Sequence, residues 1–179
     1  AFHFEAPPLD TQYMSENGHD GTKGDVLYKF STVCNGRRYV GNVAYPVEWD
    51  YDMWDSQSKP FSEFFKGKVY GDRMIKCVPG QYDMFPESYF VDAEINDGEE
   101  ITYLDSIADK LLQFKENTLY IILITLIQGG GTDEQIVAKL KYKGVTRPYH
   151  VVNTEVGIAW INKFGAYIYD GEEIKDLSK

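Results

Sequence analysis

The residues best suited to chemistry are four carboxylates interleaved with three aromatic side chains, namely Glu48, Asp50, Asp52 and Asp55 with Trp49, Tyr51 and Trp54. Two carboxylates on either side of a glycosidic bond can act as its acid and base, and aromatic faces can stack on sugar rings. This run is therefore the sharpest indication of a lectin or a glycosidase. We prefer the simpler interpretation, in which the aromatic side chains belong to an inserted loop and pack on the parent fold or on a neighbouring subunit.

A second acidic run, residues 92–100, has the composition of a calcium loop, because hard cations prefer clustered oxygen ligands. The spaced ligands and distant final Glu of an EF-hand are missing. The order Asn96-Asp97-Gly98 is typical of a turn, where Asp and Gly supply unusual backbone angles. We therefore expect a turn between strands at Phe90–Ile95 and Ile101–Leu104, and no metal site.

The other candidates for catalysis or cofactor binding are isolated. His3, His19 and His150 stand in no recognised setting for a nucleophile, a base or a zinc-binding helix, and His150 falls in a strand expected at Tyr149–Asn153. Gly129–Gly131 lacks the Lys and the Ser or Thr of a phosphate-binding loop and is typical of a flexible turn. We expect no catalytic residue and no cofactor, and hence a protein that is not an enzyme.

The charge of the chain disfavours two classes of partner. Its 28 acidic and 18 basic residues give a formal net charge of −10, and the basic residues are scattered. Binding to nucleic acid through phosphates requires clustered Lys and Arg, so we do not expect it. The longest apolar run, Leu119–Ile127, is far shorter than the roughly 20 residues that cross a bilayer, so we expect no membrane anchor.

Two further features concern the state of the cysteines and the start of the chain. Cys34 and Cys77 are too few for a disulfide scaffold, and we prefer two separate buried thiols to a single bridge. The sequence begins Ala1-Phe2-His3-Phe4, without Met or a signal-type segment, so we expect a processed product or, preferably, a piece of a longer chain.

The residues that could do chemistry must be positioned by β-hairpins. Two β-rich runs, Tyr28–Val33 and Arg38–Val43, flank Asn35-Gly36, the strongest short-range hairpin signal. A strand at Glu100–Leu104 precedes a second hairpin. The second and third hairpins are expected at Lys110–Phe114 with Thr118–Ile124 and at Gly157–Ile161 with Ala166–Tyr169.

These hairpins share a pattern that indicates an internal repeat. In each, a return strand carries an aromatic residue soon after the turn, at Tyr39, Tyr120 and Tyr167. The second and third are 47 residues apart, one period of a propeller blade. The first and second are 81 apart, which fits a blade enlarged by an insertion or two blades.

The sequence as a whole predicts an all-β fold, a propeller or a sandwich, and we favour propeller-like repeats of antiparallel hairpins in part of a larger propeller. Residues 1–27 are expected to form an extended arm or loop, and residues 28–179 a partial propeller domain with an irregular insertion at about 45–70. Thr132–Lys141 could be a helix capped at Thr132, but its alternation favours a strand.

An ordered series of segments carries a resemblance. It runs through Tyr28–Phe30, Asn35–Val43, Gly71–Lys76, Asp83–Pro86, Ile95–Gly98, Leu111–Lys115, Lys141–Val145, Gly157–Lys163 and Tyr167–Gly171. Together these segments resemble the propeller region of tail proteins of short-tailed bacteriophages, described as DNA-stabilisation, tail-nozzle or, in crAss-like phages, muzzle proteins. The insertion at Tyr45–Tyr70 and the segment Ile127–Gln135 depart from that pattern.

The resemblance implies a structural protein of the virion, made in the bacterial cytoplasm and located in the phage tail or neck. Its expected partners are copies of itself in a ring and other tail, portal or adaptor proteins. DNA would pass through the channel without specific binding. The alternative from another class is a carbohydrate-binding or glycoside-cleaving propeller that uses Trp49, Tyr51 and Trp54; a cellular protein-interaction propeller is a third.

Overall fold

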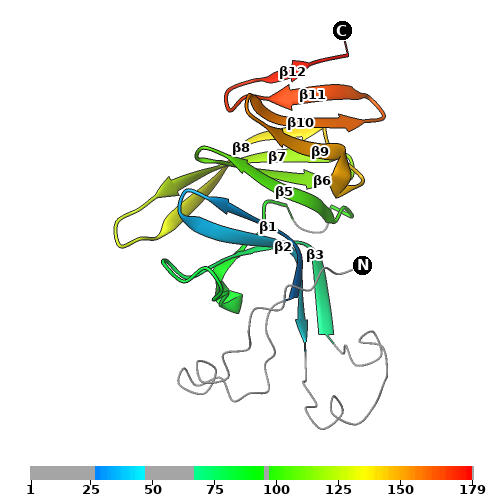
Figure 1. Ribbon diagram of the computed structural model, residues 1–179. Helices are drawn as coiled ribbons and strands as arrows, with labels where there is room; N and C mark the ends of the chain where they lie inside the picture. Colours follow the sequence, from blue (N-terminus) through cyan, green and yellow to red (C-terminus); the bar gives the residue numbers. More distant parts are fainter. Residues whose placement is uncertain (1–26, 47–66, 95–96, 179) are drawn as a thin grey trace.

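The computed structural model describes residues 27–46, 67–94 and 97–178, and within them the regular secondary structure is almost entirely β (Figure 1). Twelve antiparallel strands form three four-stranded sheets, each a meander whose strands pair in chain order. The all-β prediction is therefore confirmed; the strands of the described residues do not close into a barrel.

The three sheets follow one another along the chain. Sheet I contains β1 (Leu27–Cys34), β2 (Arg37–Pro46), β3 (Gly67–Lys76) and β4 (Phe90–Val91). Sheet II contains β5 (Ile101–Ile107), β6 (Lys110–Lys115), β7 (Thr118–Leu126) and β8 (Thr132–Lys141). Sheet III contains β9 (Val151–Thr154), β10 (Gly157–Asn162), β11 (Gly165–Tyr169) and β12 (Ile174–Asp176). Two single turns of 3-10 helix, η2 (Glu87–Tyr89) and η3 (Pro148–His150), precede β4 and β9.

The first hairpin is closed as its turn residues predict. Asn35 and Gly36 have φ angles of 46° and 75°, so both central residues are left-handed, as a type I′ turn requires. Cys34 and Arg37 form the last pair of the ladder. Asn tolerates this conformation and Gly adopts it without steric cost, which explains why the two residues stand here.

The segment Thr132–Lys141 is a strand, as its alternation predicts. It pairs with β7 along its whole length, from Leu126 with Thr132 to Thr118 with Lys141. A bulge opposite Ile121 and Ile122 makes Val137 the extra residue. The bulge interrupts the alternation, which is why the sequence also matched a helical spacing.

Three sequence-based boundaries were wrong. The strand expected at Phe90–Ile95 is only the two-residue β4. The strand expected at Tyr149–Asn153 begins at Val151, because Pro148 starts a turn of 3-10 helix there. The ends of the insertion assigned to 45–70 are strand, since β2 runs to Pro46 and β3 begins at Gly67.

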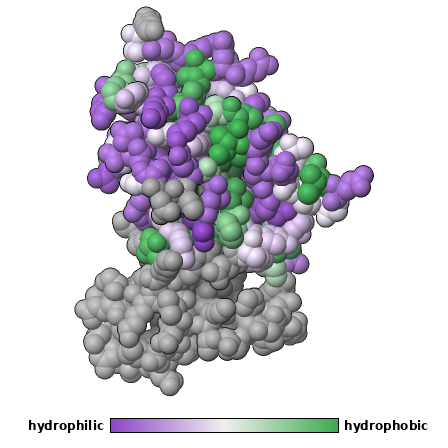
Figure 2. Space-filling model, turned by 180° about the vertical axis from the view of Figure 1, so that it is seen from behind, coloured by the Kyte–Doolittle hydropathy of each residue, from purple (hydrophilic) through white to green (hydrophobic). Residues whose placement is uncertain are grey.

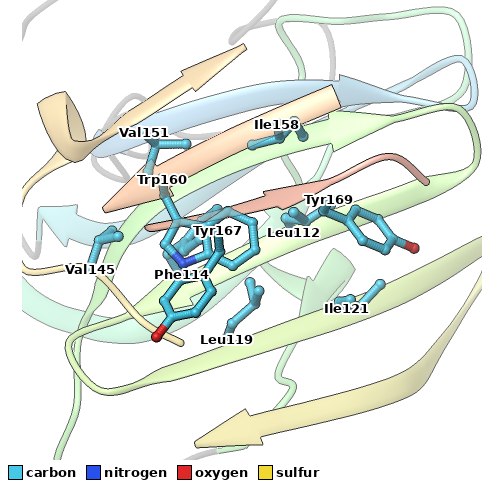
Figure 3. Packing of buried hydrophobic residues seen from close by; sticks show 10 residues of the cluster. All are labelled: Leu112, Phe114, Leu119, Ile121, Val145, Val151, Ile158, Trp160, Tyr167 and Tyr169. Carbon is cyan, nitrogen blue, oxygen red and sulfur yellow. The ribbon is translucent and has the colours of Figure 1, made fainter. Parts of the chain in front are cut away.

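The sheets are stacked face to face in chain order, with sheet II in the middle (Figure 1). One face of sheet II packs on sheet III through Phe114, Trp160 and Tyr167, whose side chains point toward one another in Figure 3. Phe114 and Trp160 meet edge to face with their ring centroids 5.4 Å apart. The other face of sheet II packs on sheet I in a second cluster of buried residues: Cys34, Tyr39, Met74, Ile101, Leu104, Leu111, Tyr120, Ile122 and Ile124.

The expected 47-residue period relates sheets II and III. Tyr120 is the third residue of β7 and Tyr167 the third residue of β11, and these are the third strands of their sheets. Tyr39 lies instead on β2, a second strand, after a turn between first and second strands. The separation of 81 residues from Tyr39 to Tyr120 is therefore not a sheet-to-sheet repeat.

Candidate functional site

The connection from sheet I to sheet II, residues 92–100, is rich in carboxylates, and three of them have separate partners. Asp92 forms a two-pronged ion pair with Arg73 at 3.0 Å. Glu99 accepts hydrogen bonds from Asn117, and Glu100 accepts one from Asn42 at 3.1 Å. Within the described residues, no group of three or more His, Cys, Asp or Glu side chains could hold a metal ion.

The end of this connection has the geometry of the turn predicted from the sequence. Gly98 has a φ of 80°, and the Asp97 carboxylate accepts a hydrogen bond from the backbone N–H of Glu99 at 3.0 Å. This is an Asx-type turn, the structure for which Asp followed by Gly is typical. Residues 95 and 96 lie outside the described residues.

A fully buried ammonium group lies against this connection. Lys115, at the end of β6, has no exposed side-chain surface; its Nζ donates to Asp97 Oδ2 at 2.7 Å and to the Glu94 carbonyl at 2.9 Å. The Nζ also lies 5.5 Å from the centroid of the Tyr120 ring. A buried charge is tolerated only when it is paired and hydrogen bonded, and Lys115 meets both conditions.

The Tyr120 hydroxyl completes the network. It donates to Glu94, which also forms an ion pair with Lys139. Burial, followed by the hydrogen bond to Glu94, raises the pKa of Tyr120. Hydrogen bonds from Lys139 and Tyr120 lower the pKa of Glu94. The phenol therefore stays protonated and the carboxylate ionised at neutral pH, so the network acts as a fixed cross-link between the connection and sheet II.

Residues 124–134, which we call the arm, extend the β7–β8 hairpin to sheet I. Lys76 of β3 donates to the Thr132 carbonyl at 2.9 Å and forms an ion pair with Glu134 at 2.7 Å. Tyr39 of β2 donates to Glu134 Oε1 at 2.9 Å. Burial is the main cause of a raised Tyr39 pKa, so this phenol also remains a donor. The arm therefore binds sheet II to two strands of sheet I.

A buried guanidinium fixes the tip of the arm. Arg37 is 3% exposed; it donates to the Gly130 carbonyl at 3.2 Å and to the Cys77 carbonyl. Its Nε has no hydrogen-bond partner, and among the described residues no carboxylate forms an ion pair with it. Carbonyl dipoles and the Tyr89 ring, 5.9 Å away, are its observed partners.

The first strands of the three sheets are joined by polar side chains. The hydroxyls of Thr32 on β1 and Ser106 on β5 are 3.0 Å apart, and Ser106 donates to the Val33 carbonyl at 2.7 Å. Asn153 on β9 donates to Asp105 on β5 at 3.4 Å. The three first strands therefore lie together on one side of the stack.

Few of the residues singled out from the sequence take part in these contacts between the sheets. The carboxylates and aromatic residues of 48–55, with His3 and His19, lie outside the described residues. Gly129–Gly131 forms the tip of the arm. His150 lies in η3, and its buried Nδ1 has no hydrogen-bond partner among the described residues. Cys34 and Cys77 are both buried and free, as preferred from the sequence.

Sequence reasoning missed Lys115, Arg37 and Glu134. One signal was present for the first: β6 alternates, so Leu111, Gln113 and Lys115 share the face of sheet II that packs on sheet I. A lysine in that series predicts a buried charge in need of a partner. No comparable local signal marks Arg37 or Glu134, whose partners are distant in the sequence.

Comparison with known proteins adds no relative. No protein-family model matches the sequence, and no curated protein matches it. Within the described residues, no helix has both the length and the apolar character needed to cross a membrane.

Proposed function

We propose that this chain is a non-enzymatic structural protein of a bacteriophage tail or neck, and that copies of it form a ring that closes or extends the channel through which DNA leaves. The proposal starts from the ordered series of segments that resembles phage tail proteins and covers most of the chain from Tyr28 to Leu177. The arrangement of the three sheets supports it.

The supporting observation is that three consecutive four-stranded meanders are stacked in chain order with their first strands together. β-Propellers are built from four-stranded antiparallel sheets arranged radially, with one strand of each sheet nearest the axis. Hydrogen bonds between Thr32 and Ser106 and between Asn153 and Asp105 join β1, β5 and β9. We interpret these strands as the inner strands of three propeller blades.

The cross-links between sheets suit a protein that bears load in an assembly. The arm and the Lys115 network join sheets I and II at two places, in addition to their apolar contact. Since packed sheets can slide when held by apolar contact alone, buried ion pairs and hydrogen bonds fix their relative position.

The net charge is compatible with a DNA channel that does not retain its cargo. A charge of −10 repels phosphates, the opposite of the steering that a basic cleft provides. In a ring around the DNA, this repulsion would allow the duplex to slide. A channel lined with Lys and Arg would contradict this part of the proposal.

The test is electron microscopy of the purified full-length gene product, with its mass measured in solution. We expect rings of defined symmetry with an axial hole. A stable monomer that binds sugars, with binding lost in Trp54→Ala, would overturn the proposal in favour of the glycan-binding alternative. Trp54→Ala should leave ring formation unchanged if the proposal is correct.

A further inference from the structure

The outer face of sheet III, which points away from sheet II, is apolar across β9, β10 and β11 and has Lys175 of β12 at its edge. Val152, Ala159 and Ile168 lie side by side across β9, β10 and β11, and Ile161 lies opposite Ala166 in the next row. Val152 is 56% exposed and Ile161 is 57% exposed. Large aliphatic side chains at such exposure on one flat sheet face indicate a contact surface. We call these five residues the open face.

The open face has the same residue pattern as the face of sheet II that packs on sheet III. Its four central residues are related by the 47-residue period to buried residues of sheet II: Leu112 to Ala159, Phe114 to Ile161, Leu119 to Ala166 and Ile121 to Ile168. The strand registers agree, since Leu112 lies opposite Ile121 just as Ala159 lies opposite Ile168. The open face is therefore built to receive another sheet.

The face of sheet III that packs on sheet II is aromatic. Sheet I, at the other end of the stack, has a similar aromatic face on its outer side. Trp160, Tyr167 and Tyr169 pack on sheet II. On the outer face of sheet I, the aromatic side chains of Tyr28, Tyr70 and Phe85 pack over Val40, Val43 and Ile75 and remain partly exposed. We call these three aromatic residues the aromatic face.

Two arginines hold the aromatic face in place. Arg38 lies 5.5 Å from the centroid of the Tyr28 ring, and Arg73 lies 4.4 Å from that of Tyr70. Each arginine is held in turn by an aspartate, Arg38 by Asp83 and Arg73 by Asp92. The rings are thus fixed before any partner binds, which lowers the entropic cost of association.

From this geometry we propose that two copies of the chain stack head to tail, the open face of each on the aromatic face of the other, and close a ring of six sheets. The three sheets of the described residues, taken twice, give six, which lies within the four to eight of closed propellers. The contact repeats the packing of Leu112, Phe114, Leu119 and Ile121 of sheet II on the aromatic side chains of sheet III. The inference rests on the ring-forming part of the proposed function and not on its phage assignment.

The surface between the two faces is of mixed character. Seen from behind, the molecule is mainly hydrophilic, with hydrophobic residues in a band along the stack (Figure 2). A head-to-tail contact uses two different faces, so it leads to closure at a fixed number of copies or to an open filament.

The first experiment measures the mass of the chain in solution by sedimentation over a range of concentrations. We expect twice the 20.5 kDa of one chain. Ile161→Lys and Ile168→Glu should each raise the dimer dissociation constant about a hundredfold, because a charge would be buried without a partner. Ile136→Lys is the matched control: Ile136 is a 44% exposed isoleucine on β8, outside both faces, and its substitution should leave the mass unchanged.

The second experiment identifies which faces meet. Ile161→Cys and Phe85→Cys chains, carrying tags of different mass, are mixed and oxidised. Head-to-tail stacking predicts cross-linked pairs that contain one chain of each kind. Pairs of two Ile161→Cys chains alone would show contact between two open faces and overturn the proposal, as would a monomeric wild-type protein.

The two proposals fail in different ways. A closed two-chain particle that never forms part of a virion would overturn the phage function and leave the stacking intact. Rings that persist in Ile161→Lys and Ile168→Glu would overturn the stacking and leave the ring function intact. Circular dichroism of each variant separates loss of contact from loss of fold.

Discussion

At the scale of single residues, Lys115 is the clearest case of a side chain that stabilises the fold only together with its hydrogen-bond and ion-pair partners. Its ammonium is fully buried, and Asp97 and the Glu94 carbonyl satisfy it. Replacing it removes the partner of a carboxylate that is itself 17% exposed. The cost comes from the unpaired group that remains, and it exceeds the net value of the pair.

We predict that Lys115→Ala lowers the free energy of unfolding by about 3 kcal/mol. Urea denaturation followed by circular dichroism would measure the change. The matched control is Lys110→Ala on the same strand, since the ion pair of Lys110 with Asp109 is partly exposed and should contribute less than about 1 kcal/mol. Equal effects of the two substitutions would contradict the role given to Lys115.

The network also predicts a dependence of stability on pH. The folded state lowers the pKa of Glu94 below its ordinary value of 4.5, through hydrogen bonds from Lys139 and Tyr120. Glu94 therefore stabilises the fold above about pH 4.5, and this contribution is lost as the pH falls through the lower folded-state pKa. The melting temperature should decrease over that acidic range.

Glu94→Gln should make the melting temperature less sensitive to acid over the same range. The substituted amide cannot titrate, so the difference in melting temperature between wild type and variant should shrink as the pH falls. Glu155→Gln, at an exposed residue of the β9–β10 turn, should run parallel to wild type. A constant difference for Glu94→Gln at every pH would contradict the assignment.

At the scale of elements, the arm is the feature that the strand pattern alone does not explain. It extends the β7–β8 hairpin beyond sheet II and ends against sheet I, where Arg37, Lys76 and Tyr39 bind it. These contacts join residues more than 50 positions apart. The arm therefore makes the position of one sheet depend on the integrity of the other.

We predict an interaction free energy of about 2 kcal/mol between Lys76 and Glu134 in a double-mutant cycle. Both side chains are largely buried, and the pair is surrounded by further hydrogen bonds. The measurement compares the unfolding free energies of Lys76→Ala, Glu134→Ala and the double variant. The exposed pair Lys175–Glu173 is the control and should give an interaction near zero. Additive effects at Lys76 and Glu134 would contradict the arm's role.

Local signals allowed some elements to be predicted and left others hidden. The Asn35-Gly36 hairpin and the 47-residue period were readable because turn residues and alternation act over a few positions. β4 was overestimated because only Phe90 and Val91 find partners on β3. A strand's length is set by the strand beside it, which a local pattern does not contain.

The candidate site was harder to predict than the fold. Lys115, Glu134 and Arg37 are charged residues, and charge in a sequence indicates a solvent-exposed position. Their burial depends on partners contributed by other sheets, so it follows only from the tertiary structure. The turn at Asp97-Gly98 was predictable because the side chain and backbone that form it are adjacent.

At the scale of the whole molecule, the acidic charge predicts how the protein behaves toward DNA. With a net charge of −10, it should not retain duplex DNA at physiological salt, because few counterions are released on contact. An electrophoretic mobility assay would test this, with a basic DNA-binding protein of similar size as the positive control. Retention of DNA that weakens steeply with added salt would reveal a basic surface. It would contradict the proposal that the DNA slides through an acidic channel.

The arm has a consequence for the order in which the protein is made. Sheet I is synthesised first, yet Arg37, Tyr39 and Lys76 receive their partners in the arm only after residues 130–134 have left the ribosome. Until then, Tyr39 and Lys76 lack the Glu134 carboxylate, and Arg37 has the Cys77 carbonyl but not the Gly130 carbonyl. Chains stalled before residue 124 should therefore be cut readily by proteases within sheet I, and resistance should appear abruptly once β8 has emerged.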